Sequence, residues 1–124
     1  LGREWPDMCA GFTNRRAELV ARALRDNLAD CLVTLPTLLD RGAATSIHFW
    51  FSNFDGIRRA LFPRLADAYA VWGDNGPQAL DAAILAGKRH WRETCERALA
   101  LRRDRGADAE SAIAGLLDAA DARL

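Results

Sequence analysis

Few side chains in this 124-residue sequence could act as a nucleophile or as a general acid or base. His90 and Cys95 lie five residues apart in a segment with helical spacing, which places them about 140° apart around the helix axis. They therefore cannot form a nucleophile–base pair by themselves. The sequence also lacks a glycine-rich phosphate loop, a GxSxG motif and a pair of carboxylates at catalytic spacing. We therefore predict no catalytic residue.

Metal-binding patterns are missing as well. Di-iron bundles use Glu-x-x-His on two of their helices, but the residues three positions before His48 and His90 are Thr45 and Gly87. His90 has Glu93 within one helical turn, yet no cysteine lies at a recognised zinc-ligand spacing from it. We predict neither a metal site nor any other cofactor.

The richest segment for binding chemistry is aromatic. Five of the ten aromatic residues lie between Phe49 and Phe62, so they are concentrated in one short stretch. Aromatic walls with a few oriented polar groups are typical of pockets for planar or anionic small molecules. An exposed patch for a protein partner and a fully packed core are the alternatives. The candidate ligand-binding residues are His48, Trp50, Phe54, Arg58, Tyr69 and Trp72.

Charge excludes several classes of partner. Seventeen basic and seventeen acidic residues cancel, so no overall field would attract nucleic acid or an anionic membrane. The short basic clusters at Arg58-Arg59 and Arg102-Arg103 have acidic residues nearby and are typical of solvated helix surfaces. No apolar run approaches the roughly 20 residues that span a bilayer. The remaining partners are a protein or a small apolar or anionic ligand, and the alanine-rich composition leaves a homo-oligomer open.

Three widely spaced cysteines without a CxxC pair indicate reduced thiols and a cytoplasmic protein. The arginine and alanine bias is typical of a GC-rich bacterial gene. A length of 124 residues fits one domain, although a chain that begins at Leu1 can be part of a longer one. Scarce β-branched residues and short loops between long helical patterns predict an all-α, antiparallel bundle of five or six helices with one long central helix.

The first long helix is expected to begin at Thr13 or Asn14, which are both good N-caps. Its apolar stripe continues to Leu32 and beyond, at alternating steps of three and four residues. Pro36 should kink or end this helix. A short continuation should stop at Gly42, because glycine accepts the left-handed conformation that ends helices.

The segment 43–52 can be one turn of buried helix or an extended connection. Ser52 or Asn53 is expected to cap the next helix. Pro63 lies in the middle of that helix's apolar stripe, which predicts a kink or two stacked helices.

The segment Pro77–Arg105 is expected to be the spine of the bundle, about 40 Å long, with Trp91 on its buried face. Asp108 should cap a last helix whose apolar stripe reaches Leu124.

These observations predict a non-catalytic helical module, either a regulatory ligand-binding domain or an adaptor that acts through protein contact. The alternative is a small enzyme with an aromatic-lined pocket, in which His48 or His90 is the acid–base group.

Overall fold

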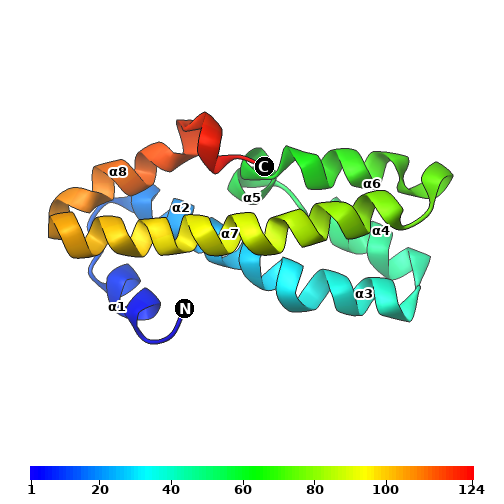
Figure 1. Ribbon diagram of the computed structural model, residues 1–124, viewed down its shortest axis with the longest axis horizontal. Coiled ribbons are helices and arrows are strands. Elements are labelled where there is room, and N and C mark those ends of the chain that lie inside the picture. Colours follow the sequence, from blue (N-terminus) through cyan, green and yellow to red (C-terminus); the bar gives the residue numbers. More distant parts are fainter.

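Helices make up all of the regular structure in the described part of the chain. The computed structural model describes residues 1–124, except for the side chain of residue 75. The prediction of an all-α bundle with one long helix is confirmed, and proline and glycine breaks divide the expected segments into shorter pieces (Figure 1). The helices are α1 (Glu4–Ala10), α2 (Arg15–Ala29), the π-helical segment η1 (Asp30–Thr34), α3 (Leu35–Arg41), α4 (Ala44–Ser52), α5 (Gly56–Leu61), α6 (Pro63–Asn75), α7 (Gln78–Arg105) and α8 (Ala109–Gly115), with 3-10 turns at Gly106–Asp108, Leu116–Asp118 and Ala120–Ala122.

The long helix α7 is the spine of the bundle. It has 28 residues, which corresponds to about 42 Å. Leu80, Trp91 and Cys95 repeat on its inner face and are at most 1% exposed. Helix α2 runs antiparallel to it, α6 packs along its first half, and α8 packs along its second half (Figure 1). The predicted spine is therefore confirmed to within one residue, because Pro77 occupies the N-cap.

Helix α2 begins where the sequence predicts. Asn14 is the N-cap, and its side chain accepts a hydrogen bond from the backbone N–H of Ala17. The helix then widens into η1, where the Leu35 N–H bonds to the carbonyl five residues back. Pro36 explains this turn, because in a regular helix its ring would clash with the carbonyl of Leu32. The extra residue rotates Leu32 out of the buried stripe, so the prediction that it is buried is wrong: it is 40% exposed.

The segment that the sequence left open is helical, since α4 spans Ala44–Ser52. It follows Gly42, which ends α3 in the left-handed conformation, as predicted. The predicted cap of the next helix is wrong, because α5 has Asp55 at its N-cap without a side-chain bond, and the Asn53 amide donates to the carbonyl of Phe49. The predicted break at Pro63 is confirmed: α5 and α6 are separate helices.

The last helix is shorter than predicted. Helix α8 ends at Gly115 and continues only as 3-10 turns, and Asp108 makes no capping bond with its side chain. The end of the chain folds back instead, so that the Leu124 N–H donates to the carbonyl of Leu61 at 2.9 Å. No helix in the described residues is long and apolar enough to cross a membrane.

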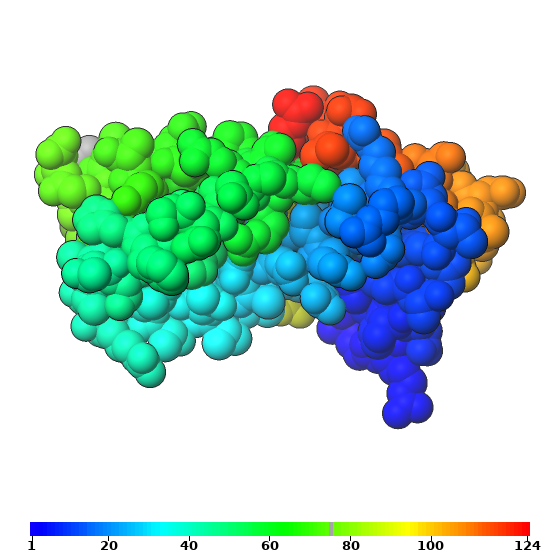
Figure 2. All heavy atoms as spheres, turned by 180° about the vertical axis from the view of Figure 1, so that it is seen from behind, coloured from blue at the N-terminus to red at the C-terminus, as the bar shows by residue number. Residues whose placement is uncertain are grey.

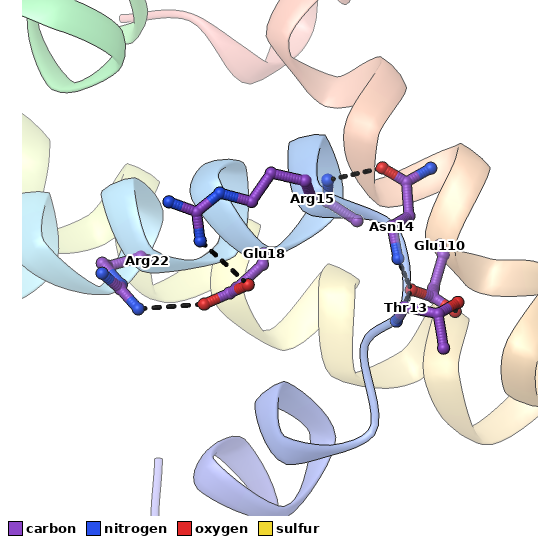
Figure 3. Close-up of polar contacts among 7 residues, drawn as sticks. Thr13, Asn14, Arg15, Glu18, Arg22 and Glu110 are labelled. Carbon is purple, nitrogen blue, oxygen red and sulfur yellow. Dashed lines mark hydrogen bonds and ion pairs between the residues drawn. The ribbon is translucent and has the colours of Figure 1, made fainter.

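A carboxylate from α8 holds the start of α2. Glu110 accepts hydrogen bonds from the backbone N–H groups of Thr13 and Asn14, each at 2.7 Å, and Figure 3 shows it at the first turn of the helix. The Asn14 N–H is the main reason that the pKa of Glu110 is lowered, and the Thr13 N–H contributes to the same shift. This contact fixes α8 against α2 and thus closes one end of the bundle.

Candidate functional site

Helix α4 brings the predicted aromatic residues together in one network. The His48 Nδ1 and the Tyr69 hydroxyl lie 2.6 Å apart, and which of them donates depends on the histidine tautomer. The rings of His48 and Trp72 meet edge to face at 5.3 Å. Residues from α4 and α6, more than twenty positions apart in sequence, are therefore in direct contact.

Phe51 joins this group to the second half of the network. Its ring stacks on Tyr69 with 4.1 Å between centroids and meets Trp50 edge to face at 4.9 Å. Trp50 in turn stacks on Phe54 at 5.2 Å. The network is therefore a continuous wall of stacked and edge-to-face rings.

Arg58 is held in place by four residues. Its guanidinium forms an ion pair with Asp30 at 2.9 Å and donates to the carbonyl of Asn53 at 3.0 Å. The same group lies over the rings of Trp50 and Phe54, 5.8 and 5.7 Å from their centroids. Burial raises the pKa of Asp30, although the neighbouring Arg58 opposes this shift. Arg58 therefore fastens α5 to η1 and to α4, and each of its two terminal nitrogens donates one hydrogen bond.

The remaining candidates for chemistry are also engaged or buried. His90 donates from Nε2 to the carbonyl of Ala122 at 2.7 Å, in the neutral form as well as the charged one. Burial raises the pKa of the Cys31 and Cys95 thiols to about 12, so both are protonated at neutral pH. Among the described residues, no three side chains of histidine, cysteine, aspartate or glutamate converge on a point that could hold a metal ion.

The network ends in a surface groove between α3 and α4, here called the α3–α4 groove. It has a volume of about 390 Å³ and lies where Figure 2 places the two helices next to each other. Phe49 stands at this groove with 71% of its surface exposed. Trp50, half-buried on the stacked rings, is the member of the predicted set that also lines it. The lining residues are Thr34, Leu38, Thr45, Ser46, Phe49 and Trp50.

The set of binding residues predicted from the sequence did not include Phe49, nor Leu38 on the α3 side of the groove. The signal was present in the spacing, because Thr45 and Phe49, like Ser46 and Trp50, are four residues apart and share one face of a helix. It could be used only once the segment was known to be helical. Leu38 comes from another helix, and its place in the groove depends on the turn at Gly42.

Comparison with known protein families places the chain in a family. A family model described as the C-terminal domain of a family of unknown function, DUF6866, matches residues 1–120. The chain belongs to this family. Neither the comparison with curated proteins nor the comparison with solved structures gave a match.

The structure brings five of the six predicted residues, His48, Trp50, Phe54, Tyr69 and Trp72, into one ring network, with Arg58 packed on its edge. Their role in binding a ligand stays a prediction.

Proposed function

We propose that this domain is a non-catalytic protein-interaction module, an adaptor, and that an apolar segment of a partner protein binds in the α3–α4 groove. The exposure of Phe49 carries the proposal. Burial of a phenylalanine side chain contributes about 1.5–3 kcal/mol. A ring that stays in water in the isolated domain leaves this free energy available to a contact with a partner.

The groove also indicates the chemistry of that partner. None of its six lining residues is charged, so a charged side chain placed there would lose hydration without gaining an ion pair. Two helices form its walls, as in the grooves that receive the apolar face of an amphipathic helix. Thr34, Thr45 and Ser46 add hydroxyl groups that can bond to polar groups at the edge of such a helix. The expected ligand is therefore an amphipathic helix that presents uncharged, apolar anchors.

The ring network gives this groove a rigid floor. Trp50 is half-buried and stacked on Phe54, and it also meets Phe51, which is buried. A side chain held in this way loses little conformational entropy on binding, which is characteristic of the aromatic anchors that dominate interfaces. The engaged guanidinium of Arg58 favours such a partner over a small anion, because an anion would have to compete with Asp30.

A small enzyme is the second candidate, and the short His48–Tyr69 hydrogen bond is the observation that favours it. His48 is exposed and paired with a phenol, an arrangement that can pass a proton to or from a bound molecule. For such an enzyme, His48→Gln should lower the rate of turnover, because glutamine cannot take up or release the proton. We further expect the domain to work in the cytoplasm, where its three free cysteines stay reduced.

Site-specific photo-cross-linking in the native cells tests the adaptor proposal. A photoreactive phenylalanine analogue is placed at position 49, and, as a control, at exposed position 105, at the far end of α7. We expect one protein to be captured from position 49 and not from 105, and the purified pair to bind in vitro. Equal capture from both positions, or a captured protein that binds Phe49→Ser as well as the unsubstituted domain, would refute the proposal.

A further inference from the structure

The exposed face of α7 carries an apolar residue with a groove on either side. Leu85 lies near the middle of the N-terminal half of α7 and is 70% exposed. Figure 1 shows α7 crossing the front of the bundle between α6 and α3. Leu85 lines both the groove toward α3, of about 530 Å³, and the groove toward α6, of about 490 Å³. This surface is here called the Leu85 face.

The two grooves have opposite charge. Asp40 and Asp81 line the groove toward α3, together with Lys88. Arg64 and Arg89 line the groove toward α6, together with one acid, Glu93. Counting these side chains gives a charge of −1 for the first groove (two acids, one base) and +1 for the second (two bases, one acid).

These charges are unused within the chain. In the described residues, none of the six forms an ion pair, whereas seven other ion pairs are present elsewhere. A surface with an exposed leucine at its centre, a negative side and a positive side is complementary to a copy of itself.

The spacing along α7 sets how two copies would meet. Asp81, Leu85 and Arg89 are four residues apart and therefore form one ridge on the helix surface. When such ridges of two helices pack side by side, the axes cross at about 50°. If the two ridges run in opposite directions, Leu85 meets Leu85 and each Asp81 lies opposite Arg89 of the other copy. The small side chains of Ala82 and Ala86 beside the ridge allow a close approach of the two backbones.

We propose that the Leu85 face is the interface of a symmetric homodimer, in which the two α7 helices pack antiparallel about Leu85 and Asp81 of each copy pairs with Arg89 of the other. The interface has twofold symmetry, so each pair occurs twice. The same rotation turns the end of the face with Asp40 toward the end with Arg64, so that the acidic groove of one copy faces the basic groove of the other. This dimer uses a different surface from the α3–α4 groove, and neither proposal depends on the other.

Sedimentation velocity of the purified protein, from micromolar to millimolar concentration, is the experiment. We expect a monomer–dimer equilibrium that weakens as salt is raised, because salt screens the exposed pairs. Asp81→Arg and Arg89→Asp should each weaken self-association by more than about tenfold, because like charges then face each other twice. Leu85→Glu should have the same effect. Arg59→Asp on α5, which changes an exposed arginine outside the face, is the control and should dimerise normally.

Mixing the two charge variants gives the decisive readout. In a mixed pair, the arginine introduced at position 81 of one copy faces the aspartate introduced at position 89 of the other, and the native Asp81 faces the native Arg89. An equimolar mixture of Asp81→Arg and Arg89→Asp should therefore form a heterodimer, although neither variant pairs with itself. Circular dichroism of each variant checks that the helices are intact. A monomeric unsubstituted protein at all concentrations, a dimer that persists in Leu85→Glu, or a mixture that stays monomeric would each overturn the proposal.

Discussion

Replacement of Gly87 by alanine sets two physical effects against each other. In an isolated helix, alanine is favoured over glycine by about 1 kcal/mol. In this protein, however, the added methyl carbon would lie 2.5 Å from the Sγ of Cys31 and 2.9 Å from the Cζ of Phe62. Both neighbours are buried, at 0% and 1% exposure, so neither can move into solvent.

The steric effect should be the larger of the two. Overpacking a core costs about 1–3 kcal/mol, and two contacts this short place Gly87→Ala at the upper end of that range. After the gain in helix propensity is subtracted, we expect the free energy of unfolding to fall by about 2 kcal/mol. Urea unfolding followed by far-ultraviolet circular dichroism, which reports the helix content, measures this change.

Two further variants identify the cause. Gly73→Ala on α6 is the matched control, because no atom lies within 4 Å of its added methyl group; it should be stabilised by about 0.4–1 kcal/mol. Cys31→Ala removes the nearer obstacle, so the loss in the Cys31→Ala/Gly87→Ala double variant should be smaller than the sum of the two single losses. If Gly87→Ala is as stable as the unsubstituted protein, the close packing of α7 on η1 is refuted.

Three other predictions concern the core and the titratable groups. Trp91→Ala should lower the free energy of unfolding by about 3–5 kcal/mol, because Trp91 is 0% exposed; a loss below about 1 kcal/mol in urea unfolding would contradict its burial. The pKa of Glu110 is lowered, first of all by the Asn14 N–H, so the ionised carboxylate stabilises the fold at neutral pH, and this stabilisation is lost as pH falls from about 4.3 through the folded pKa. The difference in Tm between Glu110→Gln and the unsubstituted protein should therefore shrink in acid. A difference in Tm that does not change with pH would exclude a stabilising role of the Glu110 carboxylate. Burial raises the pKa of the Cys31 and Cys95 thiols to about 12. A thiol reagent at mildly alkaline pH should therefore label the folded protein only at Cys9, which is half-buried. Rapid labelling of all three thiols would contradict the packing.

The fold class could be predicted because helical periodicity and chain-breaking residues are local signals. The stripe along Pro77–Arg105 and the left-handed stop at Gly42 depend on residues close together in sequence, and both are found as predicted. The exposure of Leu32 could not be predicted from periodicity, because the π-helical turn ahead of Pro36 changes the register by one residue. The early end of α8 could not be predicted from periodicity either. Its apolar pattern continues as 3-10 turns, in which the chain folds back to Leu61.

The candidate site was accessible from the sequence only in part. The sequence selected His48, Tyr69 and Trp72 as members of one candidate set, and the structure places them in contact, which their separation along the chain could not show. The engagement of Arg58 depends on Asp30, which is 28 residues away in sequence. Phe49 could not be told from a core residue, because exposure depends on where α4 packs on its neighbours.

The binding affinity of the partner captured at position 49 for a Phe49→Ser domain, measured by isothermal titration calorimetry, tests the role of the α3–α4 groove most directly. An interface anchor contributes at least about 2 kcal/mol, which corresponds to a loss of about 30-fold in affinity. Val71→Ser is the matched control, since Val71 is apolar, 40% exposed and outside the groove, and it should bind as the unsubstituted domain does. We expect the loss in Phe49→Ser alone. Equal affinities of both variants and the unsubstituted domain would contradict docking in this groove.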